Sequence, residues 1–154
     1  MVLEIDRLVA IEAIRTLKAR YFRCVDTKDW RGFASLFTAD VRFDISTDAG
    51  PCILESPDAI AHMARTRLEN CVSVHHGHCP EIRVISDTCA EAIWAMEDML
   101  RWNDPASSSI RTLHGFGHYT ESYRKEGGEW RIRALRLTRL RVDVTSWDDS
   151  IETN

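Results

Sequence analysis

Residues 88–102, TCAEAIWAMEDMLRW, decide the fold because apolar side chains recur at every second position. Side chains alternate between the two faces of a β-strand, so this spacing predicts a strand with one buried face. The even-numbered residues from Ala90 to Trp102 form that face, and Asp98 is the one polar residue among them. A carboxylate on a buried face is destabilising unless it has a partner. Asp98 is therefore either a functional group or a structural carboxylate bonded to a buried histidine or hydroxyl.

Further strands are expected around this one, in the second half of the chain. The long ones cover residues 72–86, 110–125 and 130–144. Gly127 and Gly128 lie between the last two of these, and glycine tolerates the positive φ of a tight hairpin turn. A shorter strand is expected at residues 41–45. The second half of the chain is therefore predicted to form a sheet of long antiparallel strands.

The first part of the chain is predicted to be helical. Between residues 8 and 25 an apolar residue recurs every three or four positions, which is typical of a long helix with one buried stripe. Asp29 is a suitable cap for a second, short helix, and Ser56 with Pro57 starts a third that runs to about residue 68. This order predicts an α+β fold, in which three N-terminal helices pack on a strongly curved antiparallel sheet and enclose a pocket. The length fits a single domain over residues 1–154.

The overall composition argues against several classes of protein. The net charge is −4 and the basic residues are interspersed with acidic ones, unlike the basic stripe of a nucleic-acid-binding protein. No stretch approaches the roughly 18 apolar residues of a membrane span, and the N-terminus lacks the pattern of a signal peptide. The five cysteines include no CxxC pair. We therefore expect a cytoplasmic protein with reduced thiols and with neither nucleic-acid nor membrane partners.

A histidine-rich segment, HHGHCPEI, occupies residues 75–82. Strict alternation places His76 and His78 on the face of the strand's apolar residues and His75 on the opposite face, unless a bulge occurs near Gly77 or Pro80. Histidine is the natural proton carrier near neutral pH. Two histidines two residues apart on a strand would also be able to chelate a metal ion. Because no carboxylate stands at a familiar ligand spacing, we expect no metal site.

Two residues of the first helix also stand out. Tyr21 continues the apolar stripe, and a buried tyrosine needs a hydrogen-bond partner for its hydroxyl. Asp26 lies near the end of the helix, where the partial negative charge of the C-terminus disfavours a carboxylate. A residue in a locally unfavourable position is often functional, although a solvated turn is the alternative interpretation of Asp26.

Four strings carry a resemblance to a known family. They are IEAIRTLKARYFRCVDTKDW (residues 11–30), HHGHCPEI (75–82), WAMEDML (94–100) and GGEWRIRALRLTRLRV (127–142). With them the chain resembles the SnoaL-like branch of the nuclear transport factor two-like superfamily. Within that branch it resembles the bacterial bile acid 7-alpha-dehydratases and, more distantly, the fungal scytalone dehydratases. Val25 and Ile45 stand where scytalone dehydratases have tyrosines.

The resemblance implies a set of site residues. It places catalytic groups at Tyr21, Asp26, His75 and Asp98, and a substrate-binding arginine at Arg139. It thereby selects His75 over its two neighbours and requires a bulge after it. Further substrate-binding residues are expected at Trp94, Met96, Phe116 and His118.

The implied activity is that of a cofactor-free acid/base enzyme, in particular a dehydratase acting on a small apolar polycyclic or aromatic hydroxy-ketone. In this scheme Tyr21 donates a hydrogen bond to the developing oxyanion, and His75, oriented by Asp98, moves the proton. Asp26 holds Tyr21 or His75, or protonates the departing hydroxyl. Arg139 neutralises Asp98 or binds an acidic group of the substrate.

Two other classes of function remain open at this point. One is an isomerase similar to ketosteroid isomerase, or a polyketide cyclase, on the same scaffold. The other is a non-catalytic binding or assembly subunit, which predicts a filled pocket and a salt bridge between Asp98 and Arg139. Apolar residues on the outer face of the sheet, including Ile93 and Met99, predict a homodimer or homotrimer.

Overall fold

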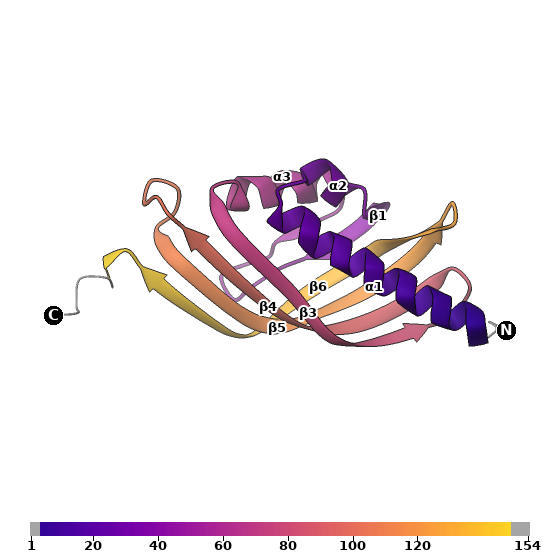
Figure 1. Ribbon diagram of the computed structural model, residues 1–154. Helices are drawn as coiled ribbons and strands as arrows, with labels where there is room; N and C mark the ends of the chain where they lie inside the picture. Colours follow the sequence, from indigo (N-terminus) through magenta and orange to yellow (C-terminus); the bar gives the residue numbers. More distant parts are fainter. Residues whose placement is uncertain (1–3, 149–154) are drawn as a thin grey trace.

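The computed structural model describes residues 4–148, and in this range it contains three helices and six strands (Figure 1). The helices are α1 (Glu4–Asp26), α2 (Trp30–Ala34) and α3 (Pro57–Leu68). The strands are β1 (Phe37–Asp44), β2 (Ile53–Leu54), β3 (Cys71–Val84), β4 (Cys89–Trp102), β5 (Ile110–Glu126) and β6 (Glu129–Ser146). The predicted α+β fold is confirmed. The ends of the predicted 1–154 domain, residues 1–3 and 149–154, lie outside the described residues.

Within the described range the strands form one sheet in the order β2-β1-β6-β5-β4-β3. Neighbouring strands are antiparallel except for β1 and β6, which run parallel. The four long strands are antiparallel, as predicted, whereas the sequence does not predict the parallel pairing of the short β1 with β6. The periodicity of a strand indicates which residues face the core, but it carries no information about the direction of a partner distant in sequence. The sequence also does not predict β2, because two residues are too few to show alternation.

The short helices begin where the capping residues predict. The side chain of Asp29 accepts a hydrogen bond from the backbone N–H of Gly32 at the start of α2, at 2.9 Å. The hydroxyl of Ser56 accepts from the N–H of Ala59 at 3.2 Å, and Pro57 is the first residue of α3. Each cap satisfies a backbone donor that has no partner within the helix, a contribution of typically about 1 kcal/mol.

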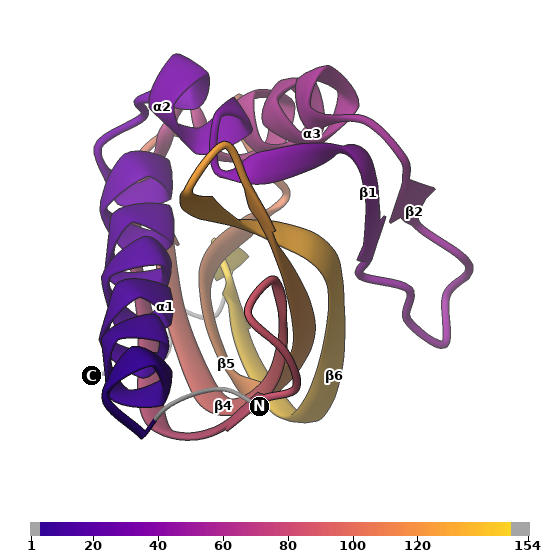
Figure 2. The same cartoon turned by 90° about the vertical axis from the view of Figure 1, so that its right-hand side faces the viewer.

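The sheet is strongly curved, and α1 lies along its open side while α2 and α3 lie above one part of it (Figure 2). Ile14 and Leu17 of α1 are buried in one core cluster together with Trp94, Ile132 and Leu135 of the sheet. Complete burial of such an apolar side chain stabilises the fold by about 1.5–3 kcal/mol. This packing makes the inner face of the sheet and the helices the two walls of one interior.

A buried ion pair crosses this interior. Lys18 on the stripe of α1 donates to the carboxylate of Glu121 on β5, and the Nζ of Lys18 lies 3.9 and 3.8 Å from the ring centroids of Tyr21 and Tyr119. Burial lowers the pKa of Lys18, and the charge of Glu121 opposes this change. The sequence analysis does not anticipate the pair, because its two residues are 103 positions apart.

Within residues 4–148, no helix is both long enough and apolar enough to cross a lipid bilayer.

Candidate active site

A cavity of about 480 Å³ lies between the inner face of the sheet and the helices. Its volume is in the range of small-molecule sites. Most of its lining is apolar or aromatic, including Val25 of α1 and Ile45 just after β1. The loop at residues 107–109 lines its rim. Polar side chains reach the cavity at His75, Asp98 and Arg139, and Thr66 and Arg67 of α3 also line it.

A bulge in β3 turns His75 toward the cavity. The register of β3 with β4 shifts between His78 and Glu81, and Cys79 has a positive φ of 39°. Residues before and after the bulge therefore have opposite parity, so that His75 and Ile82 face inward while His76 and His78 are exposed. The bulge inferred from the family resemblance is confirmed, and strict alternation through this segment is wrong.

Asp26 holds His75 in place. One carboxylate oxygen, Oδ1, lies 2.6 Å from Nδ1 of His75, and the other, Oδ2, accepts the backbone N–H of the same residue at 2.9 Å. The hydroxyl of Ser73 donates to Oδ1 at 2.9 Å, and Nζ of Lys28 donates to that hydroxyl at 2.7 Å. These donors compensate for the unfavourable position of a carboxylate at a helix C-terminus.

The end of α1 positions Asp26 for these contacts. Lys28 has a φ of 63°, and the N–H of Asp29 bonds the carbonyl of Cys24 at 2.9 Å, which is the pattern of a Schellman ending. The helix therefore ends abruptly, and its last carboxylate reaches β3 across the edge of the cavity.

His75 keeps its second ring nitrogen available. Because a carboxylate accepts hydrogen bonds, the short contact with Asp26 favours the tautomer that carries its proton on Nδ1. Nε2 then presents a lone pair, and no side chain among residues 4–148 makes a hydrogen bond with it. Since 10% of the His75 side chain is exposed and the residue lines the cavity, this lone pair is available to a bound molecule.

Tyr21 and Tyr119 are buried phenols that line the same cavity. Burial raises the pKa of Tyr21 well above its usual range, and the charge effects of Tyr119 and Glu121 act in the same direction. Burial also raises the pKa of Tyr119, although Arg139 opposes the change. Both phenols therefore stay protonated at neutral pH and are hydrogen-bond donors rather than bases.

Asp98 pairs with Arg139 across an intervening strand. Nη1 and Nη2 of Arg139 on β6 donate to the two carboxylate oxygens of Asp98 on β4, at 2.6 and 2.7 Å. The pair passes over Gly115 of β5, where a Cβ atom would lie 2.0 Å from Nη1 of Arg139 and 2.3 Å from Oδ1 of Asp98. Burial lowers the pKa of Arg139, but the hydrogen bonds and charge of Asp98 outweigh this effect and the net change is upward.

The structure corrects the expected partner of His75. His75 and Asp98 are opposite one another in the β3–β4 register, and both line the cavity. Asp98, however, is bonded to Arg139, whereas His75 is bonded to Asp26. The predicted orientation of His75 by Asp98 is therefore wrong. Of the roles considered for Asp26, the contacts support the one in which it holds His75. Of those considered for Arg139, they support the one in which it neutralises Asp98.

The other predicted binding residues do not line this cavity. Trp94 is buried and donates its indole N–H to the hydroxyl of Tyr123 at 2.9 Å. Met96 is buried beneath Arg139. Phe116 and His118 face outward, because they are opposite Glu97 and Ala95 of β4, which have the parity of the outer face. Their alternation with Gly115 and Gly117 excludes them from the inner face.

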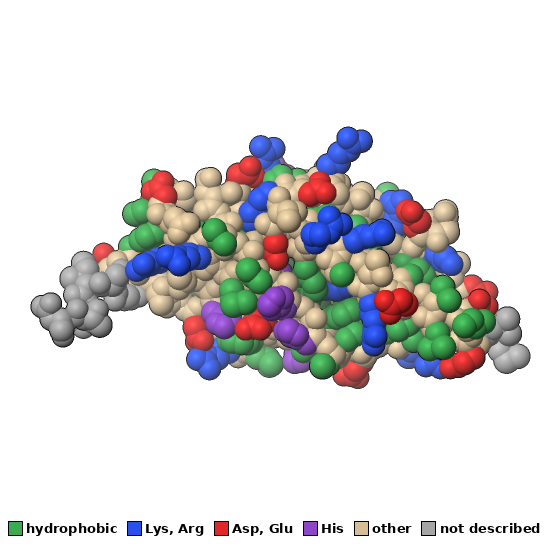
Figure 3. All heavy atoms as spheres, in the orientation of Figure 1, with side chains coloured by type: hydrophobic (Ala, Val, Ile, Leu, Met, Phe, Trp, Pro, Cys, Tyr) green, Lys and Arg blue, Asp and Glu red, His purple; other side chains and the backbone are tan. Residues whose placement is uncertain are grey.

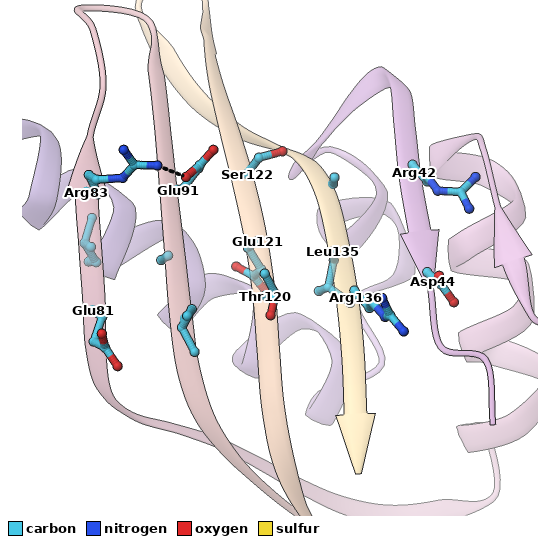
Figure 4. Close-up of a pocket in the computed structure, with 14 residues that line it drawn as sticks. Arg42, Asp44, Glu81, Arg83, Glu91, Thr120, Glu121, Ser122, Leu135 and Arg136 are labelled. Atoms are coloured by element: carbon cyan, nitrogen blue, oxygen red, sulfur yellow. Dashed lines mark hydrogen bonds and ion pairs between the residues drawn. The ribbon is translucent and has the colours of Figure 1, made fainter. Parts of the chain in front are cut away.

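A second hollow, of about 740 Å³, lies on the outer face of the sheet (Figure 4). Its charged lining includes Arg42 and Asp44 of β1 and an ion pair at 2.6 Å between Arg83 and Glu91. It has neither a histidine nor a cysteine in its lining, so it lacks a group that exchanges a proton near neutral pH. The inner cavity is therefore the candidate active site.

Sequence reasoning missed four contributors to the site. They are Lys28, Ser73, Gly115 and Tyr119. Inward parity on β5 would have found Tyr119, which lies on the same face of the strand as Gly115 and Gly117. The remaining three act through contacts between segments distant in sequence, for which the sequence contains no local signal.

The fold and the cavity define a class: a cone-shaped α+β domain of the nuclear transport factor two-like type, with an internal small-molecule pocket. Within that class the chain belongs to the SnoaL-like domain family, whose model matches residues 6–136.

Solved structures with the same fold include proteins of several descriptions. A Novosphingobium aromaticivorans protein provisionally assigned as a scytalone dehydratase is 18% identical, with a TM-score of 0.81 over 92% of this chain and 91% of that one. A type 2 hexachlorocyclohexane dehydrochlorinase, LinA, is also 18% identical, with a TM-score of 0.79 over 94% of this chain and 95% of that one. A beta subunit provisionally assigned to an aromatic-ring-hydroxylating dioxygenase of N. aromaticivorans is 20% identical, with a TM-score of 0.70 over 88% of this chain and 93% of that one. At these identities the likeness concerns the fold.

Proposed function

We propose that this protein is a cofactor-free lyase that eliminates water from a small apolar hydroxy-ketone, with His75 as the base. The observation that carries the proposal is the Asp26–His75 pair, whose Nε2 is available to the apolar cavity. A dehydratase and a dehydrochlorinase both catalyse eliminations, and the names of two solved structures with this fold therefore support the proposal.

The proposed reaction begins with removal of a proton from the carbon next to the carbonyl. His75 Nε2 accepts this proton, and the electron pair of the C–H bond moves toward the carbonyl oxygen. Asp26 stabilises the resulting imidazolium through Nδ1. The electrons then form the carbon–carbon double bond as the C–O bond of the β-hydroxyl breaks. The imidazolium returns the proton to the departing oxygen, which leaves as water.

The phenols of Tyr21 and Tyr119 fit the oxyanion of this reaction. Both line the cavity and both remain protonated, because burial raises their pKa. A donor aimed at charge that develops in the transition state contributes about 2.7–4 kcal/mol in comparable sites. We assign Tyr21, the residue implied by the family resemblance, as the principal donor.

The walls of the cavity favour a substrate that is mostly apolar. Arg139 is already neutralised by Asp98 through two hydrogen bonds, so this pair adds no net charge to the lining. The remaining walls are largely apolar and aromatic, and they also include the guanidinium of Arg67, an exposed residue of α3. A fused-ring or aromatic hydroxy-ketone, including a steroid of the kind that bile acid dehydratases use, matches the largely apolar walls.

A panel of β-hydroxy ketones, from bicyclic aromatic compounds to 3-oxo steroids, tests the proposal. We expect at least one polycyclic member to lose water, detected by mass spectrometry and by the absorbance of the conjugated product. In deuterium oxide the recovered substrate should contain deuterium at the α-carbon wherever the imidazolium proton exchanges with solvent and the enolate is reprotonated before the hydroxyl departs. Saturable binding of panel members with neither water loss nor α-exchange would contradict the proposal and favour a binding subunit.

An isomerase is the second candidate, since one base beside two protonated phenols also suits enolisation without a leaving group. The same panel separates the two reactions. A β,γ-unsaturated 3-oxo steroid would be converted to a conjugated product of unchanged mass by an isomerase, whereas a dehydratase acts on the hydroxylated compounds.

We also expect the chain to form a homodimer or homotrimer through the outer face of the sheet. Val72 and Ile93 on that face are 59% and 42% exposed, so the face keeps apolar side chains that an interface would cover. Light scattering should give about two or three times the 17.7 kDa mass of one chain at micromolar concentration, and Ile93→Glu should reduce it. A wild-type mass near 17.7 kDa would contradict this expectation.

A further inference from the structure

A cluster of three histidines and one glutamate lies on the outer face of the sheet, away from the cavity. His76 and His78 are on β3, Glu97 is on β4 and His114 is on β5. His76 is directly opposite Glu97 in the β3–β4 register. Figure 3 shows histidine side chains gathered around acidic ones on the surface below α1. The bulge that turns His75 inward is what leaves His76 and His78 on this outer face.

The donor atoms of this cluster converge. Oε2 of Glu97 lies 3.8 Å from Nδ1 of His76 and 3.7 Å from Nε2 of His78, and the three ligand atoms are all within 4.8 Å of one another. In a tetrahedral zinc site with bonds of about 2.1 Å, the donor atoms are roughly 3.4 Å apart. Small side-chain rotations therefore bring all three atoms into ligand positions.

His114 completes the arrangement from the neighbouring strand. Its Nε2 lies 2.7 Å from Oε1 of Glu97, the carboxylate oxygen that does not face the other two histidines. An outer histidine that bonds the free oxygen of a ligating carboxylate fixes the orientation of that ligand, and such contacts contribute roughly 10- to 100-fold to metal affinity.

We propose that His76, His78 and Glu97 bind a divalent transition-metal ion of the zinc type, with His114 holding the carboxylate in position. Two imidazoles and one carboxylate are a ligand set that suits zinc and its neighbours and leaves a fourth position for water. Hard cations such as Mg²⁺ prefer sites made of oxygen ligands alone. In the single chain the side chains of His76 and His78 are 47% and 51% exposed, so an ion reaches the site from solvent before any assembly through this face.

The bound ion would connect β3 to β4 immediately before the bulge. It would lie on the face of β3 opposite His75, so it does not take part in the proposed elimination. Binding should therefore stabilise the fold by mass action without being required for turnover.

The test is a titration of tag-free, chelator-treated protein with ZnCl₂, followed by calorimetry and by the thermal unfolding temperature. We expect saturable binding of one ion per chain and a rise in unfolding temperature, with no such effect from MgCl₂. His78→Ala should weaken binding by roughly 100-fold or more, and His114→Ala by roughly 10-fold, if His114 acts through Glu97. Glu97→Gln should weaken binding as well, since the amide replaces a charged ligand.

His62→Ala is the matched control, because His62 is exposed on α3, away from the cluster. The control should bind zinc as the wild type does. Equal loss in His62→Ala and His78→Ala would mean dispersed binding to surface histidines and would overturn the proposal. Absence of saturable binding in the wild type, or equal competition by Mg²⁺, would overturn it as well. All four substituted side chains are at least partly exposed, so circular dichroism should show unchanged folding in each variant.

Discussion

Replacement of His75 by alanine is expected to reduce kcat on the best substrate of the panel by roughly 10²- to 10⁴-fold, the usual contribution of a positioned acid/base. The imidazole is the group in the cavity whose free nitrogen is able to accept a proton near neutral pH, since Tyr21 and Tyr119 remain protonated. Ligand affinity should change much less than turnover, because the lost interaction acts mainly in the transition state.

Asp26→Asn should produce a loss of similar size, because the amide no longer selects the tautomer that leaves Nε2 free. The double variant Asp26→Asn/His75→Ala should be little worse than the poorer single variant, since the two residues act as one unit. His62→Ala, with its exposed imidazole on α3, should retain full activity and serves as the control. If the two losses multiply instead, Asp26 and His75 contribute separately and the proposed unit is wrong.

The second large effect is expected on stability, from the ion pair between Asp98 and Arg139. Arg139→Met leaves the Asp98 carboxylate, of which 4% is exposed, without the donor of the hydrogen bonds to its two oxygens. Removal of one member of a buried pair costs about 3–5 kcal/mol. The free energy of unfolding from urea denaturation should therefore fall by about that amount, and Asp98→Asn in the same chain should recover part of it.

Gly115→Ala should also lower the free energy of unfolding, because its Cβ would occupy the space in which the side chains of Asp98 and Arg139 meet. Arg136→Met is the matched control: Arg136 is an exposed arginine of the same strand, so its replacement should change stability by no more than about 0.5 kcal/mol. A small loss in Arg139→Met, similar to that in Arg136→Met, would show that Asp98 is solvated and that the pair does not hold β4 to β6.

The two predictions separate two parts of the site. The Asp26–His75 pair, at the junction of α1 and β3, is expected to determine turnover. The Asp98–Arg139 pair joins β4 and β6 over β5 and is expected to determine the stability and the neutral charge of the cavity wall. A substitution in the Asp98–Arg139 pair should therefore lower the unfolding temperature and leave turnover at low temperature unchanged.

Several features of this protein follow from local sequence alone, since they depend on contacts within a few residues. Alternation along residues 88–102 places Asp98 on the buried face, where 3% of the residue is exposed. Asp29 and Ser56 start their helices because a side-chain oxygen next to free backbone N–H groups is sufficient for a cap. The α+β class and the curved sheet follow from the order of these elements.

Only the tertiary structure decided which polar groups are partners. His75 bonds Asp26, 49 residues away, rather than the Asp98 opposite it in the sheet, and Lys18 bonds Glu121 across the core. Glu97 joins His76 and His78 because β3 and β4 pair in one particular register, whereas the sequence around the histidines contains no suitable carboxylate. The parallel pairing of β1 with β6 likewise has no local signature. Periodicity specifies the face on which a side chain lies, but hydrogen bonds and ion pairs depend on distances between segments that only the folded chain brings together.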